Sequence, residues 1–138
     1  MNYRPATPAD LHLLAVFNEH LIEDERADTR LSLRELESRM QTWLDTDYQA
    51  AIFEVDAVPI GYALFRPQEH GIYLRQFFIA RHARRRGLGR MAVSLLLRDV
   101  LPKGCRVTLE VLDHNEAGLA FWQALGFVGH AQTLKTHT

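Results

Sequence analysis

The sequence predicts a single α/β domain in which a mostly antiparallel sheet comes first and a β-α-β unit follows. Apolar residues recur near the helical period in residues 10–22 and 32–45, which predicts two helices. Residues 49–55 and 58–66 change to a strand period, and the short link between them predicts a hairpin. From residue 72 to residue 100, a strand-like run, a glycine turn and a helix-like run follow in that order. These three patterns carry the fold prediction.

The start of the chain is expected to form one edge strand and two helices. Residues 1–6 predict a short edge strand. Thr7 or Asp10 is a suitable N-cap for the first helix. Ser32 and Glu35 have the spacing of a capping box, so the second helix is expected to begin there after a charged loop.

The remaining elements alternate between strands and helices. After the hairpin, residues 71–80 predict a long strand, and residues 88–100 a helix that follows the glycine turn. Residues 105–112 alternate as a strand, residues 115–125 predict a helix, and residues 127–134 a last strand. The expected order is therefore β-α-α-β-β-β-α-β-α-β.

The composition is that of an ordinary globular domain. Of the 138 residues, 47% are hydrophobic and 24% are charged, with a formal net charge of -1. We therefore expect residues 1–138 to form one domain with a real core. The single cysteine, Cys105, suits a small buried residue in a reducing cytosol. No apolar run is long enough to span a membrane and the first residues lack a signal peptide, so a cytoplasmic location is expected.

The most informative segment is the basic glycine turn between the long strand and the third helix. It reads Arg84-Arg85-Arg86-Gly87-Leu88-Gly89-Arg90. A turn of this kind points several backbone N–H groups of the first helical turn at one spot, with the helix dipole behind them. Its two glycines let a bulky anion approach the main chain. The turn therefore predicts a phosphate-binding site.

One alternative for this turn is a dinucleotide site. Gly87, Gly89 and Ala92 approximate the dinucleotide fingerprint, and Glu110 lies about 20 residues further on. However, a run of Arg and His residues separates the strand from the first glycine, whereas the dinucleotide turn is tight. The chain also has too few β-α-β units for a doubly wound sheet.

A second alternative is nucleic acid, because the basic run is dense. It contains Arg81, Arg84, Arg85, Arg86 and Arg90. Against this, the chain as a whole is slightly acidic and has no other basic segment interleaved with aromatic residues. No nucleic-acid partner is therefore expected.

Two motifs resemble the GNAT family of N-acetyltransferases. The family's acetyl-CoA signature is Gln or Arg, two residues, Gly, one residue, then Gly or Ala, and residues 84–89 match it throughout. Asn115, followed by Ala-Phe-Trp-Gln-Ala-Leu-Gly-Phe at residues 120–127, is similar to the family's segment from Asn to "YxxLGF". The resemblance covers nearly the whole chain and implies a mixed, mostly antiparallel sheet of about six to seven strands with about four helices.

The resemblance also implies where acetyl-CoA binds. Main-chain groups of Phe77, Phe78 and Ile79 would pair with the pantetheine arm. The pyrophosphate would be held at Arg84, Arg85, Arg86, Gly87, Leu88, Gly89 and Arg90. Asn115 is expected to form a hydrogen bond with the cofactor arm, and it is equally suited to cap the last helix.

The catalytic groups are less clear from the family pattern. The resemblance is strongest to enzymes that acetylate ribosomal-protein alanine termini, in which a strand glutamate five residues before the Asn acts as general base. Glu110 has that place here, although an outward-facing, solvated glutamate fits the pattern equally well. Seven residues after Asn115, where the family has its acidic tyrosine, this chain has Trp122, whose indole N–H is no acid near neutral pH.

Other groups could take the place of the missing acid. Tyr62, Tyr73 and His114 are candidates that also have ordinary structural explanations. Trp122 could instead form a hydrogen bond with the sulfur or stack against the cofactor channel. A thiol of pKa near 8.5 also leaves tolerably as its anion. The sequence leaves the proton donor open.

The acceptor is likewise open between two kinds of amine. The charged loop at residues 23–30 would attract a cationic amine, or is simply a solvated loop. Arg66 and Arg75 would instead clamp a carboxylate such as that of an amino acid, or pair with acidic residues of the chain.

The sequence thus predicts an acetyl-CoA-dependent N-acetyltransferase that transfers the acetyl group directly to a primary amine of a small molecule or protein. The alternative is a non-catalytic acyl-CoA-binding or sensing module on the same fold. No metal and no membrane partner are expected, and a homodimer is compatible with the pattern.

Overall fold

The computed structural model describes residues 1–84 and 86–138, and its centre is a mixed sheet of five strands in the order β1-β2-β3-β4-β5. The strands are β1 (Asn2–Pro5), β2 (Gln49–Val55), β3 (Val58–Gln68), β4 (Gly71–Ile79) and β5 (Arg106–Thr108). The first four strands pair antiparallel in chain order, and β5 pairs parallel to β4. The predicted mixed, mostly antiparallel α/β fold is confirmed.

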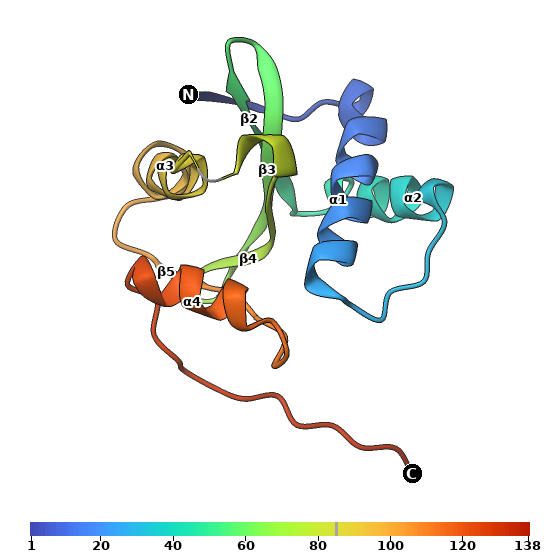
Figure 1. Cartoon of the computed structure of the whole chain (residues 1–138), viewed down its shortest axis with the longest axis vertical. Helices are drawn as coiled ribbons and strands as arrows, with labels where there is room; N and C mark the ends of the chain where they lie inside the picture. The colour runs from blue at the N-terminus through green and yellow to red at the C-terminus, as the bar shows by residue number, and fades with distance from the viewer. Residues whose placement is uncertain (85) are drawn as a thin grey trace.

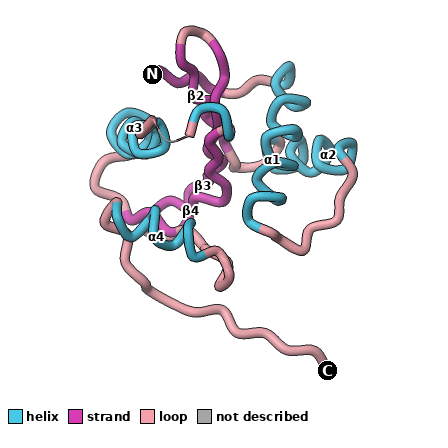
Figure 2. Tube along the Cα trace, in the orientation of Figure 1, coloured by secondary structure: helices cyan, strands magenta, loops and turns pink. Residues whose placement is uncertain are grey.

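Four α-helices flank this sheet. They are α1 (Leu11–Glu25), α2 (Leu33–Leu44), α3 (Leu88–Leu95) and α4 (Glu116–Ala124). A π-helical turn, Leu96–Val100, continues α3, and 3₁₀ turns at Pro8–Asp10 and Arg81–Ala83 precede α1 and follow β4. Figure 1 shows α1 and α2 on one face of the sheet and α3 on the other, and Figure 2 shows the strands as a band between them.

Strand alternation divides the core into two apolar clusters. On β3, Tyr62 and Leu64 join the cluster under α1 and α2, which we call the α1/α2 face. Ala63 and Phe65 join the cluster under α3, against which Trp122 of α4 also packs, and we call this the α3/α4 face. The two faces of the sheet therefore pack against different helices.

A bulge interrupts the pairing of β3 with β4. Leu64 pairs with Gln76 and Phe65 with Leu74, so Arg75 has no partner in the register. An extra residue in one strand bends it and re-aims a side chain. Here the guanidinium of Arg75 reaches the α1/α2 face, where Nη1 donates to the Tyr48 hydroxyl at 3.1 Å.

The expected six to seven strands are too many. Residues 127–134, predicted as a last strand, have no regular secondary structure, and Val128 and Leu134 are 84% and 88% exposed. Figure 1 shows this segment leading away from the domain. The predicted strand 105–112 is reduced to Arg106–Thr108. A further strand would need a neighbouring strand edge to satisfy its backbone hydrogen bonds, and β5 provides an edge of only three residues.

The helix boundaries agree with the capping signals. Ser32 and Glu35 form the predicted capping box, with Ser32 N–H donating to Glu35 Oε1 at 2.9 Å and Glu35 N–H donating to Ser32 Oγ at 3.2 Å. Helix α1 continues to Glu25, into the segment that the sequence predicted as a loop, and ends at Arg26 in the left-handed conformation.

Asp10 joins β1 to the start of α1. Its carboxylate accepts hydrogen bonds from both terminal nitrogens of Arg4 and from the backbone N–H of Thr7, each at 2.8 Å. Arg4 also donates to Glu54 of β2 at 3.1 Å. The hydrogen bonds from Arg4 lower the pKa of Asp10 to about 2, against the opposing effect of burial. The buried carboxylate therefore ties β1, α1 and β2 together.

We predict that Asp10→Asn lowers the free energy of unfolding by about 2 kcal/mol at neutral pH, the amount that corresponds to the lowered pKa. Because the folded-state pKa lies below the unfolded value, this contribution is present above about pH 4 and is lost as the pH falls toward about 2. Urea unfolding of both proteins across that range checks this. Asp99→Asn, which removes an exposed pair with neighbouring Arg98, is the control, and an equal loss in both variants would contradict the assignment.

Candidate functional site

The glycine turn presents the N-terminus of α3 at the end of β4. Gly87 is the N-cap of α3 and has φ 70°, in the left-handed region that favours glycine. Its carbonyl accepts the first helical hydrogen bond, from Met91 N–H at 3.1 Å. The N–H groups of the first helical turn therefore point out of the helix end, as an anion site requires. Arg85, which the sequence also assigned to this turn, lies outside the described residues.

The arginines of the turn divide into two groups. Arg84 donates from Nε to the carbonyl of Ile79 at 2.8 Å and pairs with Asp24 of α1. Arg81 pairs with Glu23 at 2.9 Å and Asp24 at 3.1 Å. These two side chains brace the turn against α1.

The other described arginines of the turn, Arg86 and Arg90, are exposed. Within residues 1–84 and 86–138 they form no ion pair. They therefore supply the positive charge at the open side of the turn, beside the N-terminus of α3.

Strand β4 has a free edge that leads into this turn. β5 pairs with β4 only at residues 71–73, so in the described part of the chain no strand covers residues 74–79 on that side. Backbone N–H and C=O groups along such an edge are available to an extended ligand. By strand rise, the free edge is about 20 Å long.

The side chains of the free edge are used by the core. Phe78 packs with Phe17 at a ring distance of 5.3 Å on the α1/α2 face. Phe77 packs with Phe53 at 5.9 Å on the α3/α4 face. Because Phe78 and Ile79 are buried and Phe77 is half-buried against the core, the edge offers a ligand mainly its main chain, which fits the main-chain role that the sequence assigned to these residues.

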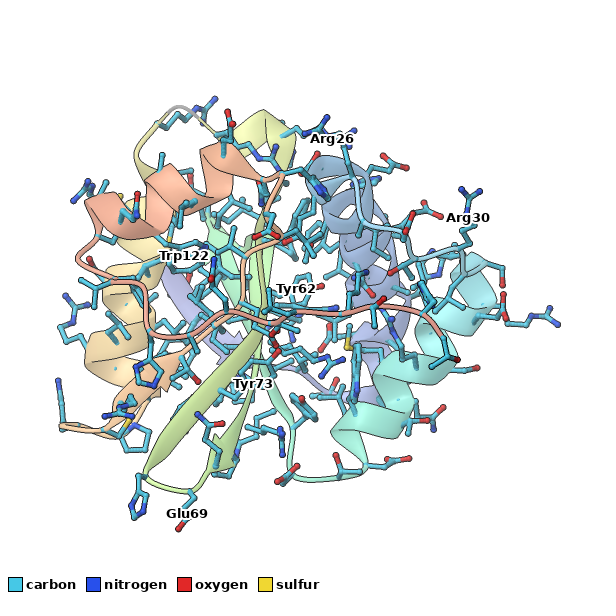
Figure 3. The ribbon with its side chains drawn as sticks, turned by 90° about the horizontal axis from the view of Figure 1, so that it is seen from below. Arg26, Arg30, Tyr62, Glu69, Tyr73 and Trp122 are labelled. Carbon is cyan, nitrogen blue, oxygen red and sulfur yellow. The ribbon has the colours of Figure 1, made fainter. Side chains whose placement is uncertain are left out.

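Trp122 is enclosed by aromatic rings. Its ring lies 5.3 Å from Phe77, 5.0 Å from Phe121 and 5.1 Å from Phe127, each in an edge arrangement. Figure 3 shows Trp122 beside α4, on the side away from the loop that carries Arg26. The tryptophan therefore fixes α4 to β4.

Helix α4 also approaches the glycine turn directly. A Cβ added to Gly89 would lie 3.2 Å from Cε1 of Phe121, tighter than an ordinary contact. Glycine at this position lets Phe121 pack against the first turn of α3. The second glycine of the motif therefore has a packing role as well as the predicted role of admitting an anion.

Asn115 caps α4. Its Oδ1 accepts the backbone N–H of Gly118 at 3.0 Å. The capping role foreseen from the sequence is confirmed, and the Nδ2 group remains as a further donor at the mouth of the helix. A contact of that donor with a cofactor stays a prediction.

Glu110 and Tyr73 form a pair. Glu110 lies two residues beyond the end of β5, so it is not inside a strand as the sequence suggested. The Tyr73 hydroxyl donates to Glu110 Oε1 at 2.8 Å. Burial, followed by this carboxylate, raises the pKa of Tyr73 to about 12. Two residues that the sequence named separately are thus brought into contact, and Tyr73 keeps its proton throughout the neutral range.

The end of α1 is fastened to the segment before α4 by two reciprocal hydrogen bonds. Arg26 Nη2 donates to the carbonyl of His114 at 3.1 Å, and His114 Nε2 donates to the carbonyl of Glu25 at 2.7 Å. The Glu25 side chain is half-buried, and burial, followed by the neighbouring Asp24, raises its pKa. Sequence reasoning missed this burial because Glu25 stands in a highly charged run.

The middle of the α1/α2 face is polar. The Tyr62 hydroxyl donates to Gln76 Oε1 at 2.7 Å, and burial, the largest effect, raises the Tyr62 pKa well above its usual value. Arg66 and Arg75 lie on this face as well, each near the ring of Tyr48. Figure 3 shows Tyr62 and Tyr73 at the strands in the centre of the molecule, apart from Trp122. The candidate site therefore has a cofactor side and a separate polar side.

Residues 1–84 and 86–138 contain neither a membrane span nor a metal cluster. No helix there is long and apolar enough to cross a membrane. No group of three or more His, Cys, Asp or Glu side chains in the same described ranges is arranged to hold a metal ion.

This geometry agrees with the comparison to protein families. Residues 13–127 match the model of the acetyltransferase (GNAT) family. The chain belongs to this family of acetyltransferases, so the sheet, the glycine turn and the free edge of β4 are the framework of an acetyl-transferring domain. A search of curated proteins found no match.

Solved structures with the same fold include three with known or suggested activity. A possible acetyltransferase from Clostridium difficile has a TM-score of 0.78 at 15% identity, over 99% of this chain and 96% of that chain. An acetyltransferase from Thermus thermophilus has a TM-score of 0.76 at 27% identity, over 92% and 86%. An aminoglycoside N-acetyltransferase in complex with CoA has a TM-score of 0.77 at 18% identity, over 99% and 93%.

Two substitutions separate the capping role of Asn115 from its expected cofactor contact. Asn115→Ala removes both and should lower the free energy of unfolding by about 1 kcal/mol, whereas Asn115→Ser keeps a capping oxygen and most of that stability. Both variants lose Nδ2, so each should bind coenzyme A roughly 2- to 10-fold more weakly. Chemical denaturation and calorimetric titration measure the two effects. Unchanged affinity in the Ser variant would contradict the cofactor contact.

Proposed function

We propose that this protein is an N-acetyltransferase that moves the acetyl group of acetyl-CoA to a primary amine by direct attack in a ternary complex. The observation that carries the proposal is the free edge of β4, which leads into the N-terminus of α3 in a chain of the GNAT family. One site for an extended arm and one for a diphosphate are thereby joined end to end.

The proposed cofactor position follows from these two features. The pyrophosphate would lie at the N–H groups of residues 86–90, where the helix end and the exposed side chains of Arg86 and Arg90 favour an anion. The pantetheine arm would follow the main chain from Ile79 back along residues 77–79. Its thioester end would then come near the bulge at Arg75, two residues beyond Tyr73, the last residue of β4 that pairs with β5.

The reaction needs a neutral amine and a leaving thiolate. The amine nitrogen attacks the thioester carbonyl, the C–N bond forms and the C–S bond breaks, while the amine loses one proton and the sulfur gains one. Glu110 is the proposed acceptor of the amine proton. Tyr73 holds the Glu110 carboxylate in position by donating the 2.8 Å hydrogen bond to Oε1, which leaves Oε2 to meet the amine.

The proton donor for the sulfur is not Trp122, because an indole N–H is no acid. Its place among three aromatic rings supports a packing role along the cofactor side. The lack of an acid at position 122 favours the second candidate function, a non-catalytic acyl-CoA sensor. In that case coenzyme A would bind at the same turn, and no amine would be acetylated.

Three finer expectations from the sequence remain part of this proposal. The first is the resemblance to enzymes that acetylate ribosomal-protein alanine termini, which rests on the spacing of Glu110, Asn115 and position 122. The second is a cytoplasmic location, and the third is a single domain over residues 1–138, with a homodimer left open.

The direct test is release of free thiol from acetyl-CoA in the presence of a panel of primary amines. We expect at least one amine to accelerate thiol release above the rate without amine, with formation of the matching acetamide by mass spectrometry. Tight binding of acetyl-CoA with no acceleration by any amine would overturn the enzyme in favour of the sensor.

A pH profile tests Glu110 as the base. Glu110→Gln should lose roughly 10²-fold or more of the turnover at low pH, where the acceptor amine arrives protonated, and less at high pH, where free amine is abundant. Steady-state rates from pH 6 to about pH 10 measure this difference. Glu116→Gln, at the exposed first turn of α4, is the matched control. An unaltered profile in Glu110→Gln would remove it from the mechanism.

A further inference from the structure

Six side chains on the α1/α2 face stack as alternating guanidinium groups and aromatic rings. In spatial order they are Arg39, Trp43, Arg75, Tyr48, Arg66 and Tyr73, and we call them the arginine ladder. Both Arg39 and Arg75 lie 4.6 Å from the centre of the Trp43 ring. Arg66 lies 5.5 Å from the Tyr48 ring and 5.8 Å from the Tyr73 ring. Stacking holds three cations in fixed positions on one surface.

The ladder has three positive charges and no counter-charge. Among the described residues, no Asp or Glu forms an ion pair with Arg39, Arg66 or Arg75. Burial lowers the pKa of Arg39, and the nearby charge of Arg75 lowers it further. Clustered like charges that are partly desolvated are costly to fold unless an anion joins them.

The unpaired polar atoms of this face are all donors. Asn18 Nδ2, Arg39 Nε and Arg66 Nε are buried without a hydrogen-bond partner. Asn18 is 1% exposed, and its Oδ1 accepts Arg39 Nη2 at 3.0 Å. Because a guanidinium only donates, the accepting atom must be the amide oxygen, and the unpaired atom is the N–H₂ group. A bound anion would accept the hydrogen bonds that these donors do not make within the described protein.

The ladder adjoins the point where acetyl transfer would occur. Arg75 is the bulge residue of β4, at the start of the free edge. At the other end, the Tyr73 hydroxyl contacts Glu110, the proposed base.

We infer that the acceptor is an amino-carboxylate, a molecule whose carboxylate binds the arginine ladder while its amine faces Glu110, the proposed base. This inference rests on the proposed acetyl transfer and names the acceptor class for it. Planar guanidinium forks match a carboxylate in a bidentate geometry, and Asn18 adds an amide donor. A purely cationic polyamine would meet three like charges at this surface.

The inference is tested with pairs of acceptors that differ only in charge. Each pair is an amino acid and its carboxamide, in an α-amino series and a linear ω-amino series of increasing chain length. For at least one chain length we expect kcat/KM to be higher for the carboxylate by roughly 10- to 100-fold, as for loss of a charge-assisted hydrogen bond. The acceptor chain length at which the carboxylate is most strongly preferred over the carboxamide indicates the distance between the arginine ladder and the thioester.

Two variants connect that preference to the ladder. Arg75→Gln and Arg66→Gln should each reduce the ratio of kcat/KM for the carboxylate to kcat/KM for the carboxamide to a few-fold. Arg34→Gln is the matched control, because Arg34 is an exposed arginine on the same helix as Arg39. A preference that survives in both ladder variants would overturn the assignment.

A binding experiment keeps the outcome independent of catalysis. Wild-type protein without acetyl-CoA is titrated with the N-acetylated amino acid and with its carboxamide while its thermal midpoint is followed. The carboxylate should raise the midpoint, and Arg75→Gln should abolish the rise.

If carboxamides are acetylated as well as carboxylates at every chain length, the acceptor class is wrong although acetyl transfer stands. If no amine reacts but the carboxylate still stabilises the protein through the ladder, acetyl transfer is wrong and the anion site stands.

Discussion

The functional architecture depends on the way strand β4 loses its outer partner after Tyr73. Up to that residue, β5 satisfies the edge of β4, and beyond it the backbone of residues 74–79 is open. An unpaired strand edge inside a domain is an unfavourable arrangement unless a ligand completes it. The glycine turn continues the same line, because Gly87 directs the next residues into a helix whose N–H groups face outward. The proposed cofactor side thus combines the open backbone of residues 74–79 with the exposed N-terminus of α3.

Helix α1 links the glycine turn to the arginine ladder. Asp24 pairs with Arg81 and Arg84 and so holds the glycine turn, while Glu25, the next residue, is half-buried and its carbonyl accepts a hydrogen bond from His114. Asn18, further back on the same helix, binds Arg39. One helix therefore positions the turn, an acidic group and part of the arginine ladder. The charged residues at the end of α1 therefore make tertiary contacts, although Glu23 and Arg81 are also more than half exposed to solvent.

Local patterns in the sequence were sufficient for most elements but not for the site's electrostatics. The capping box at Ser32, the left-handed Gly87 and the cap at Asn115 depend on neighbours within a few residues, so they could be recognised in advance. The strand expected at 127–134 failed because pairing depends on the length of a distant edge. The Glu110–Tyr73 contact joins residues 37 positions apart and has no local signature.

By itself, the sequence determined the fold class, the family and the position of the glycine turn that begins α3, because glycines, caps and apolar periodicity act over one or two turns of chain. Only the tertiary structure decided how the arginines are used. Arg84 braces the turn, whereas Arg39, Arg66 and Arg75 come together from α2, β3 and β4 and form no ion pair with an acidic residue in the part of the chain that the structure describes. The sequence shows which residues are charged, but the energy of each charge depends on which other groups tertiary packing places within a few ångströms of it.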